Sequence, residues 1–284
     1  MSMSINTNVG AETAAIAAQR AAAMMDEAML RLSTGKRINT AADDAAGLAV
    51  ATRMAKEIAG LGQALRNAND AQGLVDTGEA ALKEVTTLLL RMREIAVSAS
   101  SDTNTDADRA ALDTEVTALE TEISRIGDQT SWGGITLFNG SVGEKASPIR
   151  FHLGPTSTNF IDVTLGVVSI AARSGDLQGS LSLTGNVTSR ANAVSYITGI
   201  DAAISIISAR RGNFGAVSNR LTSAIANLEN MKSSMVTAKG QVEDANYAEE
   251  TAKLARAQIL MQAATAMLAQ ANASKNATLK LVTG

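Results

Sequence analysis

The 284-residue chain has no cysteine, one histidine, two prolines and only 2% aromatic residues. Without cysteine, neither disulfides nor thiolate metal sites can form. Because an interior proline breaks a helix, a chain with two prolines leaves room for long uninterrupted helices. The abundant alanine and the 11 methionines favour helices that pack at close range. The composition therefore predicts a mainly α protein.

The charge pattern excludes several functional classes. A net charge of −3 and a pI near 5.4 argue against a general nucleic-acid binder. No run of about 18 apolar residues is seen, so no membrane span is expected. The opening MSMSINTNVG lacks the positive start and apolar core of a cleaved signal peptide. Taken alone, these residues indicate a cytoplasmic protein, unless export uses an uncleaved signal.

Enzymatic chemistry is also unsupported. His152 lies in the alternating run RFHLG, which favours a rim position on a strand over a catalytic or metal-binding role. Asp43 and Asp44 are better explained as helix-capping residues than as a metal or acid pair. Because no nucleophile–histidine or carboxylate–metal constellation is apparent, we expect no cofactor and no catalysis.

Both ends of the chain carry apolar residues in alternating steps of four and three. Such spacing places them on one stripe of a helix, and the stripe needs a partner helix. We predict that the two terminal helices pair as a coiled coil. The predicted self-assembly seam consists of Met25, Met29, Leu32, Leu254, Met261 and Leu268. An ordinary intramolecular helix hairpin is the alternative interpretation.

The carboxy-terminal segment 258–271 is apolar on every face, and such a helix must be buried. One partner helix covers only one stripe, so we predict that Ile259, Leu260 and Met267 contact neighbouring subunits. An alanine-rich seam buries little apolar area, whereas ordering a residue costs about 1–2 kcal/mol of backbone entropy. We therefore expect the ends to be largely disordered in the monomer and to fold on assembly.

The amino-terminal part is predicted to begin with an extended or disordered lead over residues 1–15. A helix follows to about Leu32, where Gly35 can close it with a left-handed cap. Thr40 with Asp43 resembles a capping box that starts the next helix. That helix is predicted to run over 45–99, with an interruption near Gly73 or Gly78.

The remaining elements follow from similar patterns. A helix over 107–127, capped by Asp106, should lie antiparallel to its predecessor because the turn between them is short. Alternation between 149 and 165 predicts a β-hairpin, and 171–192 is expected to be loop or weak strand. A helix over 196–242 would be about 70 Å long. Within it, Gly212 and Gly215 predict a bend or a close backbone contact.

Together these elements predict a long antiparallel helical rod, paired terminal helices and a small β-hairpin region. The expected division is 1–44 and 245–284 for the two halves of a terminal coiled-coil domain, 45–140 and 193–244 for the two parts of the rod, and 141–192 for a short variable β/loop region.

Several motifs support a more specific interpretation. LSTGKRINTAADDAAGLAVATRM, LRNANDAQGLVDTGEAALKEV and LLLRMREIAVSAS resemble the amino-terminal region of bacterial flagellin. GAVSNRLTSAIANLE, VEDANYAEETAKLARAQIL and MQAATAMLAQAN resemble its carboxy-terminal region. The resemblance covers roughly residues 4–140 and 195–284. The middle is short, so the chain resembles a minimal flagellin.

This resemblance implies a structural subunit that polymerises into the extracellular flagellar filament for swimming motility and is exported without a cleaved signal peptide. It also implies an export chaperone on the carboxy-terminal helix, and filament cap and hook-junction proteins as partners. In many flagellins toll-like receptor five recognises a motif in this region. The matching positions here are Arg91, Ile95 and Glu115. A hook-associated junction protein of the same fold is the nearest alternative. A signalling coiled coil would predict continuous heptads through 130–190.

Overall fold

The computed structural model describes residues 7–139, 148–154, 158–165, 168, 183 and 185–283, with the backbone alone described over 278–283. The elements in these ranges are long helices and two small antiparallel hairpins, which confirms the predicted mainly α class. The chain divides into two compact units. The terminal unit comprises Met1–Ile58 and Ser234–Gly284, and the central unit comprises Ala59–Ser233.

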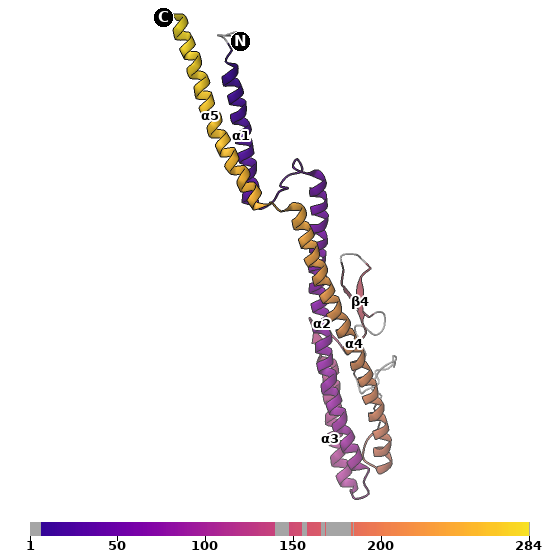
Figure 1. Cartoon of the computed structure of the whole chain (residues 1–284). Coiled ribbons are helices and arrows are strands. Elements are labelled where there is room, and N and C mark those ends of the chain that lie inside the picture. The colour runs from indigo at the N-terminus through magenta and orange to yellow at the C-terminus, as the bar shows by residue number, and fades with distance from the viewer. Residues whose placement is uncertain are drawn as a thin grey trace. The chain divides into compact units, whose positions relative to one another are not determined.

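The terminal unit contains α1 (Val9–Thr34) and α5 (Tyr247–Thr283), which run antiparallel side by side (Figure 1). The predicted lead over 1–15 is wrong from Val9 onward, because the Asn8 side chain caps α1 by accepting from the Ala11 amide. At the other end Gly35 adopts φ 70° and donates to the Arg31 carbonyl, which confirms the predicted left-handed cap.

The start of α2 (Ala45–Ala99) agrees with the predicted bounds, but its cap differs from the prediction. The Asp43 carboxylate accepts from the amides of Asn39 and Thr40 and so closes the preceding turn. Asp44 is the residue that caps the helix, because it accepts from the amide of Gly47. The proposed restart by Thr40 and Asp43 is therefore wrong as a helix cap. The cap therefore lies four residues after Thr40, at an aspartate, which is a residue that caps helices well.

In the central unit α2 packs with α3 (Asp106–Gln129) and α4 (Arg190–Glu243). The helix α2 runs through Gly73 and Gly78 without the predicted interruption. Thr105, not Asp106, caps α3, and it forms a capping box with Asp108. The helix α3 ends at Gln129, slightly beyond the predicted end.

Ion pairs show how the central helices are oriented. Arg91 of α2 bonds Glu115 of α3, and Ala99 of α2 accepts from Arg109 of α3, so the contacts run in reverse order. This order confirms the predicted antiparallel arrangement of the two helices. Glu79 and Arg93 of α2 bond residues of α4 in reverse order, namely Arg211 and Asp201. The helix α2 is therefore antiparallel to both neighbours.

The core of the central unit is built from buried apolar residues that recur at helical spacing. Buried residues of α2 include Leu82, Val85, Leu89, Met92, Ala96 and Ala99. Those of α4 include Tyr196, Ile200, Ala203, Ile207, Phe214 and Leu221. The register of α4 is as expected, although the helix begins at Arg190, before the predicted start. A side chain added at Gly212 or Gly215 would meet open space, so neither marks a close backbone contact.

By length and composition alone, α4 holds one 18-residue window apolar enough to cross a membrane. Mean hydropathy over a window does not require a continuous apolar run, so the expectation of no membrane span stays a prediction.

The β region lies within the central unit. Strand β1 (Ser131–Trp132) pairs with β2 (Ile135–Thr136), and β3 (Ile149–His152) pairs with β4 (Phe160–Val163). The second pair confirms the predicted hairpin. His152 lies exposed in β3, and its carbonyl accepts from Asn67 of α2. Of the stretch 171–192, residues 190–192 are helical, and most of the rest lies outside the described residues.

Gly73 of α2 provides a test of how the first hairpin is seated. A methyl group there would lie 2.6 Å from a ring carbon of Trp132, the only tryptophan in the chain. We expect Gly73→Ala to displace this ring into water and to shift its fluorescence emission to longer wavelength. In the control Gly62→Ala the nearest atom is 4.0 Å away, so emission should be unchanged and stability should rise by about 0.5–1 kcal/mol. Unchanged emission in Gly73→Ala would show that the ring is not seated on α2.

Candidate self-assembly surface

An alanine seam joins α1 and α5. Ala14, Ala21 and Ala28 of α1 and Ala257 and Ala264 of α5 are buried at seven-residue spacing. Because alanine carries only a methyl group, the two backbones approach within 8 Å between Cα atoms over much of their length. No other helix pair within the described ranges does so over more than isolated positions. The sequence stripe included two of these residues, Ala257 and Ala264.

The predicted seam residues lie around these alanines. Half-buried side chains flank the seam, namely Met25, Leu32, Leu254, Met261 and Leu268. Met29 is 45% exposed, so its assignment to the contact between the two helices is wrong. Its neighbour Ala28 takes the buried position. The sequence analysis gave more weight to large side chains than to alanines. It therefore missed Ala14, Ala21 and Ala28, although their seven-residue spacing is visible in the sequence.

Large apolar side chains point away from the seam on both helices. Ile259, Leu260 and Met267 of α5 are exposed, as are Ile16 and Met24 of α1. Monomeric proteins rarely leave large contiguous apolar patches in water, and those that occur mark interaction sites. This surface is therefore the candidate functional site of the chain.

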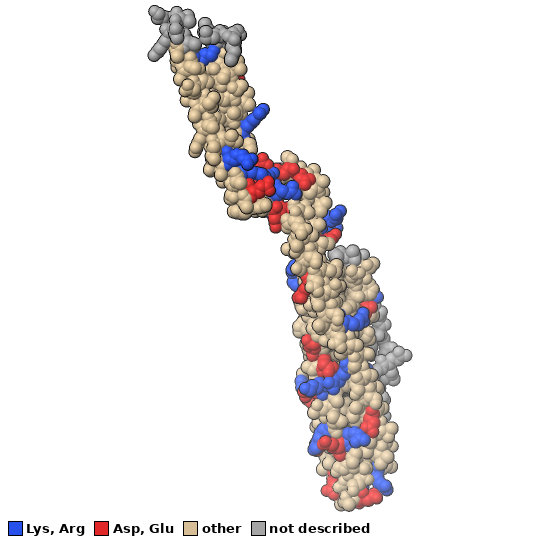
Figure 2. Space-filling model, in the orientation of Figure 1, with Lys and Arg blue, Asp and Glu red and all other residues tan. Residues whose placement is uncertain are grey.

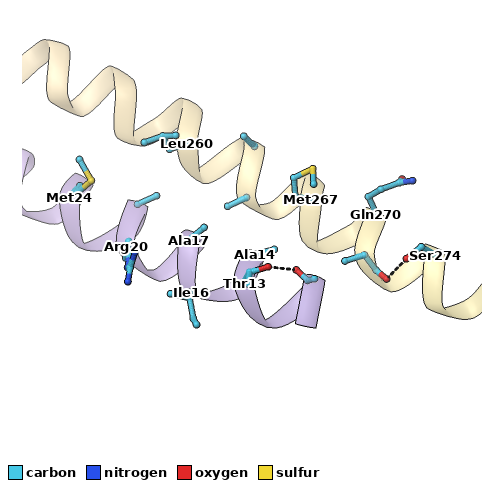
Figure 3. Close-up of a pocket in the computed structure, with 15 residues that line it drawn as sticks. Thr13, Ala14, Ile16, Ala17, Arg20, Met24, Leu260, Met267, Gln270 and Ser274 are labelled. Atoms are coloured by element: carbon cyan, nitrogen blue, oxygen red, sulfur yellow. Dashed lines mark hydrogen bonds between the residues drawn. The ribbon is translucent and has the colours of Figure 1, made fainter. Parts of the chain in front are cut away.

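Part of the surface is a groove of about 930 Å³ between α1 and α5 (Figure 3). Its lining is Gly10, Thr13, Ala14, Ile16, Ala17, Arg20, Ala21, Met24, Leu260, Ala263, Ala264, Met267, Gln270, Ala271 and Ser274. Among these described side chains Arg20 alone is charged. The Thr13 hydroxyl donates to the Val9 carbonyl and the Ser274 hydroxyl to the Ala271 carbonyl, so both donors are satisfied within their own helices.

Charged groups gather instead where α1 and α5 meet the connecting segments, whereas most of the rest of the pair is uncharged on the face that Figure 2 draws. Lys36 and Lys239 both bond the Glu243 carboxylate. Arg31 and Lys253 bond Glu250 at 3.4 and 2.9 Å. The sequence analysis missed this cluster, because its members are spread over α1, α4, α5 and the connections.

The electrostatics of the cluster follow from these contacts. Hydrogen bonds from Lys36 and Lys239 hold the pKa of Glu243 below its usual value. Burial alone would raise the pKa of Glu250, but the bonds and charges of Lys253 and Arg31 outweigh it, so this pKa is also lowered. The connections are further tied by backbone bonds from Arg37 to Glu243 and from Ala245 to Gly35.

This arrangement predicts acid sensitivity. A glutamate whose folded pKa lies below its ordinary value of 4.5 stabilises the fold fully above that value, and the stabilisation is lost as the pH falls through the folded pKa. We expect the helical signal of the terminal unit in the assembled protein to melt at lower temperature on acidification towards about pH 3. Glu243→Gln should flatten this dependence, whereas Glu249→Gln, at an exposed carboxylate, should preserve it. Thermal melts by circular dichroism measure both, and equal pH profiles would contradict the assignment.

The three residues matched to the receptor motif lie in the central unit. Arg91 donates to Glu115 at 2.8 Å, and both side chains are exposed. Ile95 is only 3% exposed and belongs to the hydrophobic core. Its side chain is therefore buried in this fold, and the match of these three residues to the receptor motif stays a prediction.

Comparison with known proteins agrees with this architecture. Residues 5–142 match the family model for the bacterial flagellin N-terminal helical region, and residues 197–282 match that for the bacterial flagellin C-terminal helical region. The chain therefore belongs to the bacterial flagellin family, whose members are structural subunits of the flagellar filament.

Individual relatives support the assignment. A flagellin of Halalkalibacterium halodurans is 39% identical over 90% of this chain and 91% of its own length. Flagellin A of Vibrio cholerae is 29% identical over 99% of this chain and all of its own length. The crystal structure of Bacillus cereus flagellin matches with a TM-score of 0.50 and 30% identity, over 57% of this chain and 88% of that one.

Proposed function

We propose that this chain polymerises through the outward apolar face of α1 and α5, with the alanine seam holding the two helices together within each subunit. Met267 carries the proposal, because it is a large apolar side chain that is 61% exposed, and residues 257–274 of its helix carry no charge. In a filament, other copies of the chain would cover Ile259, Leu260 and Met267.

We propose further that the terminal helices become fully ordered only on assembly. The seam is made of alanines, each of which buries little apolar area at roughly 25 cal/mol per Å². Backbone ordering costs about 1–2 kcal/mol for each residue, so contacts with other copies would supply the missing stabilisation. Hydrogen exchange tests this point, since slow exchange of α1 and α5 amides in the free monomer would contradict it.

The partners implied by the family resemblance are also proposals. An export chaperone would cover the apolar face of α5 before assembly, and cap and hook-junction proteins would meet the chain at the filament ends. We propose an extracellular location reached without a cleaved signal peptide, which intact amino-terminal residues in filaments from culture medium would support. Recognition by toll-like receptor five would rest on Arg91 and Glu115, since Ile95 is buried.

A pair of substitutions tests the assembly surface. Leu260→Asp places a charge on the proposed interface, and burial of an unpaired charge costs several kcal/mol. We expect filaments to be lost in electron micrographs while the monomer keeps its fold. Val194→Asp places the same charge at a comparably exposed residue of the central unit, where we expect filament growth to continue.

Retained growth in the Leu260 variant would contradict the proposal. Filament length also separates the two roles considered for the chain, because a filament subunit grows long polymers and a hook-associated junction protein does not.

A further inference from the structure

Methionines are concentrated on the assembly surface. Met24, Met25 and Met29 lie on α1, and Met261 and Met267 lie on α5. Two of them, Met24 and Met267, line the groove and are 43% and 61% exposed (Figure 3). We propose that Met24 and Met267 are oxidation sites, at which a peroxide-class oxidant converts the free subunit into a form that cannot assemble. This inference rests on the proposed function.

The reaction requires only the two thioethers and peroxide. A sulfur–oxygen bond forms as the oxygen–oxygen bond of hydrogen peroxide breaks, and the departing hydroxyl leaves with a proton as water. The thioether loses two electrons and the peroxide gains them. The product is methionine sulfoxide, which is polar and which methionine sulfoxide reductases convert back to the thioether.

The groove is poorly equipped to hold a sulfoxide. The hydroxyls of Thr13 and Ser274 already donate to their own helices. Arg20 and Gln270 are the remaining polar side chains of the lining, and both are exposed to water. If another copy of the chain covers the groove, the sulfoxide oxygens and the side chains of Arg20 and Gln270 all lose their contact with water. This loss makes assembly of the oxidised chain less favourable. We expect oxidation to raise the concentration needed for assembly about tenfold or more.

The chain contains its own reference methionines. Met92 is fully buried in the core of the central unit, so peroxide should not reach it. Met231 of α4 is 42% exposed, nearly the same as Met24, but belongs to the central unit and not to the groove. Susceptibility of thioethers follows exposure. Met231 should therefore oxidise in the monomer together with Met24 and Met267, without affecting assembly.

The experiment uses full-length protein obtained by depolymerising filaments. Monomers are treated with hydrogen peroxide, the oxidant is removed, and peptide mass mapping gives the sulfoxide fraction at each methionine. Light scattering and electron microscopy then give the concentration needed for filament growth. We expect that concentration to rise with oxidation and to return after treatment with methionine sulfoxide reductases. Unchanged assembly with both groove methionines oxidised would overturn the inference.

Variants identify the responsible sulfurs, each compared with its own untreated protein. Leucine has nearly the volume of methionine but no sulfur to oxidise. Oxidation should change assembly of the Met24→Leu, Met267→Leu double variant less than about twofold. Met231→Leu and Met29→Leu, whose exposed sulfurs lie outside the groove, should each respond as strongly as the native chain. An equal response in the double variant would overturn the assignment.

Intact filaments give a second measurement that needs no substitution. Because assembly would cover the groove, Met24 and Met267 should oxidise at least about tenfold more slowly in filaments than in monomers, with Met231 as the reference. Equal rates in the two forms would overturn the inference. A native chain that forms no filaments before oxidation would instead contradict the proposed function, and this inference would fall with it.

Discussion

A chain lacking residues 265–284 is expected to form no filaments at any concentration at which the full-length chain does. The deletion removes Met267 and Leu268 together with the part of α5 that lies against the start of α1, where Asn8 donates to the carbonyl of Ala271. The outward apolar face loses Met267, and the start of α1 loses the part of α5 that it packs against. Electron microscopy under conditions that polymerise the full-length protein measures the result.

The same truncation should leave the central unit intact, because the core cluster lies between Ala68 and Leu221. Its thermal transition in differential scanning calorimetry should match that of the full-length chain. Filaments grown by the truncated chain would contradict the role assigned to α5. Loss of the central transition would instead show that the two units do not fold separately.

The second large effect is expected in the core of α2. Leu89→Ala should lower the free energy of unfolding by about 2–5 kcal/mol, because Leu89 is fully buried and the substitution leaves a cavity. The adjacent Leu90 lies about 100° further round the helix and is 49% exposed. Leu90→Ala is therefore expected to change the free energy of unfolding by at most about 0.5 kcal/mol.

This matched pair distinguishes core packing from helix propensity, since both variants make the same replacement in the same helix. Urea denaturation followed by circular dichroism gives both values. A loss of similar size in the two variants would contradict the register of α2.

The buried positions of the central helices could be predicted from the sequence, because the apolar stripes are long and consist of large side chains. The register from Tyr196 to Leu221 keeps alternating steps of three and four over several turns, and the structure buries those positions. Each repeated step adds support to a single register. A hairpin between 149 and 165 was predicted for a similar reason, because alternation has a period that no helix shares.

The first residue of each helix was harder to predict, because neighbouring residues can each act as the N-cap. Thr105 and Asp106 are both good caps, as are Asp43 and Asp44, and only the folded backbone decides between them. The beginning of α1 was missed for another reason. Small and polar residues precede Ile16, and the Asn8 cap gives only a short local signal.

The candidate surface was predicted in part. Ile259, Leu260 and Met267 follow from a helix that is apolar all round, and they are exposed in the single chain. The seam was misread at Met29, because Met29 and Ala28 are adjacent and both apolar. Which of them faces α5 depends on how closely the two backbones approach, and alanine permits the closer approach. The ion pairs of Glu243 and Glu250 join distant segments, which helical periodicity does not reveal.

Electron cryomicroscopy of the assembled protein tests the central claim most directly, namely that the outward apolar face of α1 and α5 is covered by other copies of the chain. We expect Ile259, Leu260 and Met267, all exposed in the single chain, to be packed against side chains of neighbouring subunits. Filaments in which these three side chains face open solvent, with the subunits joined through the central unit alone, would contradict it.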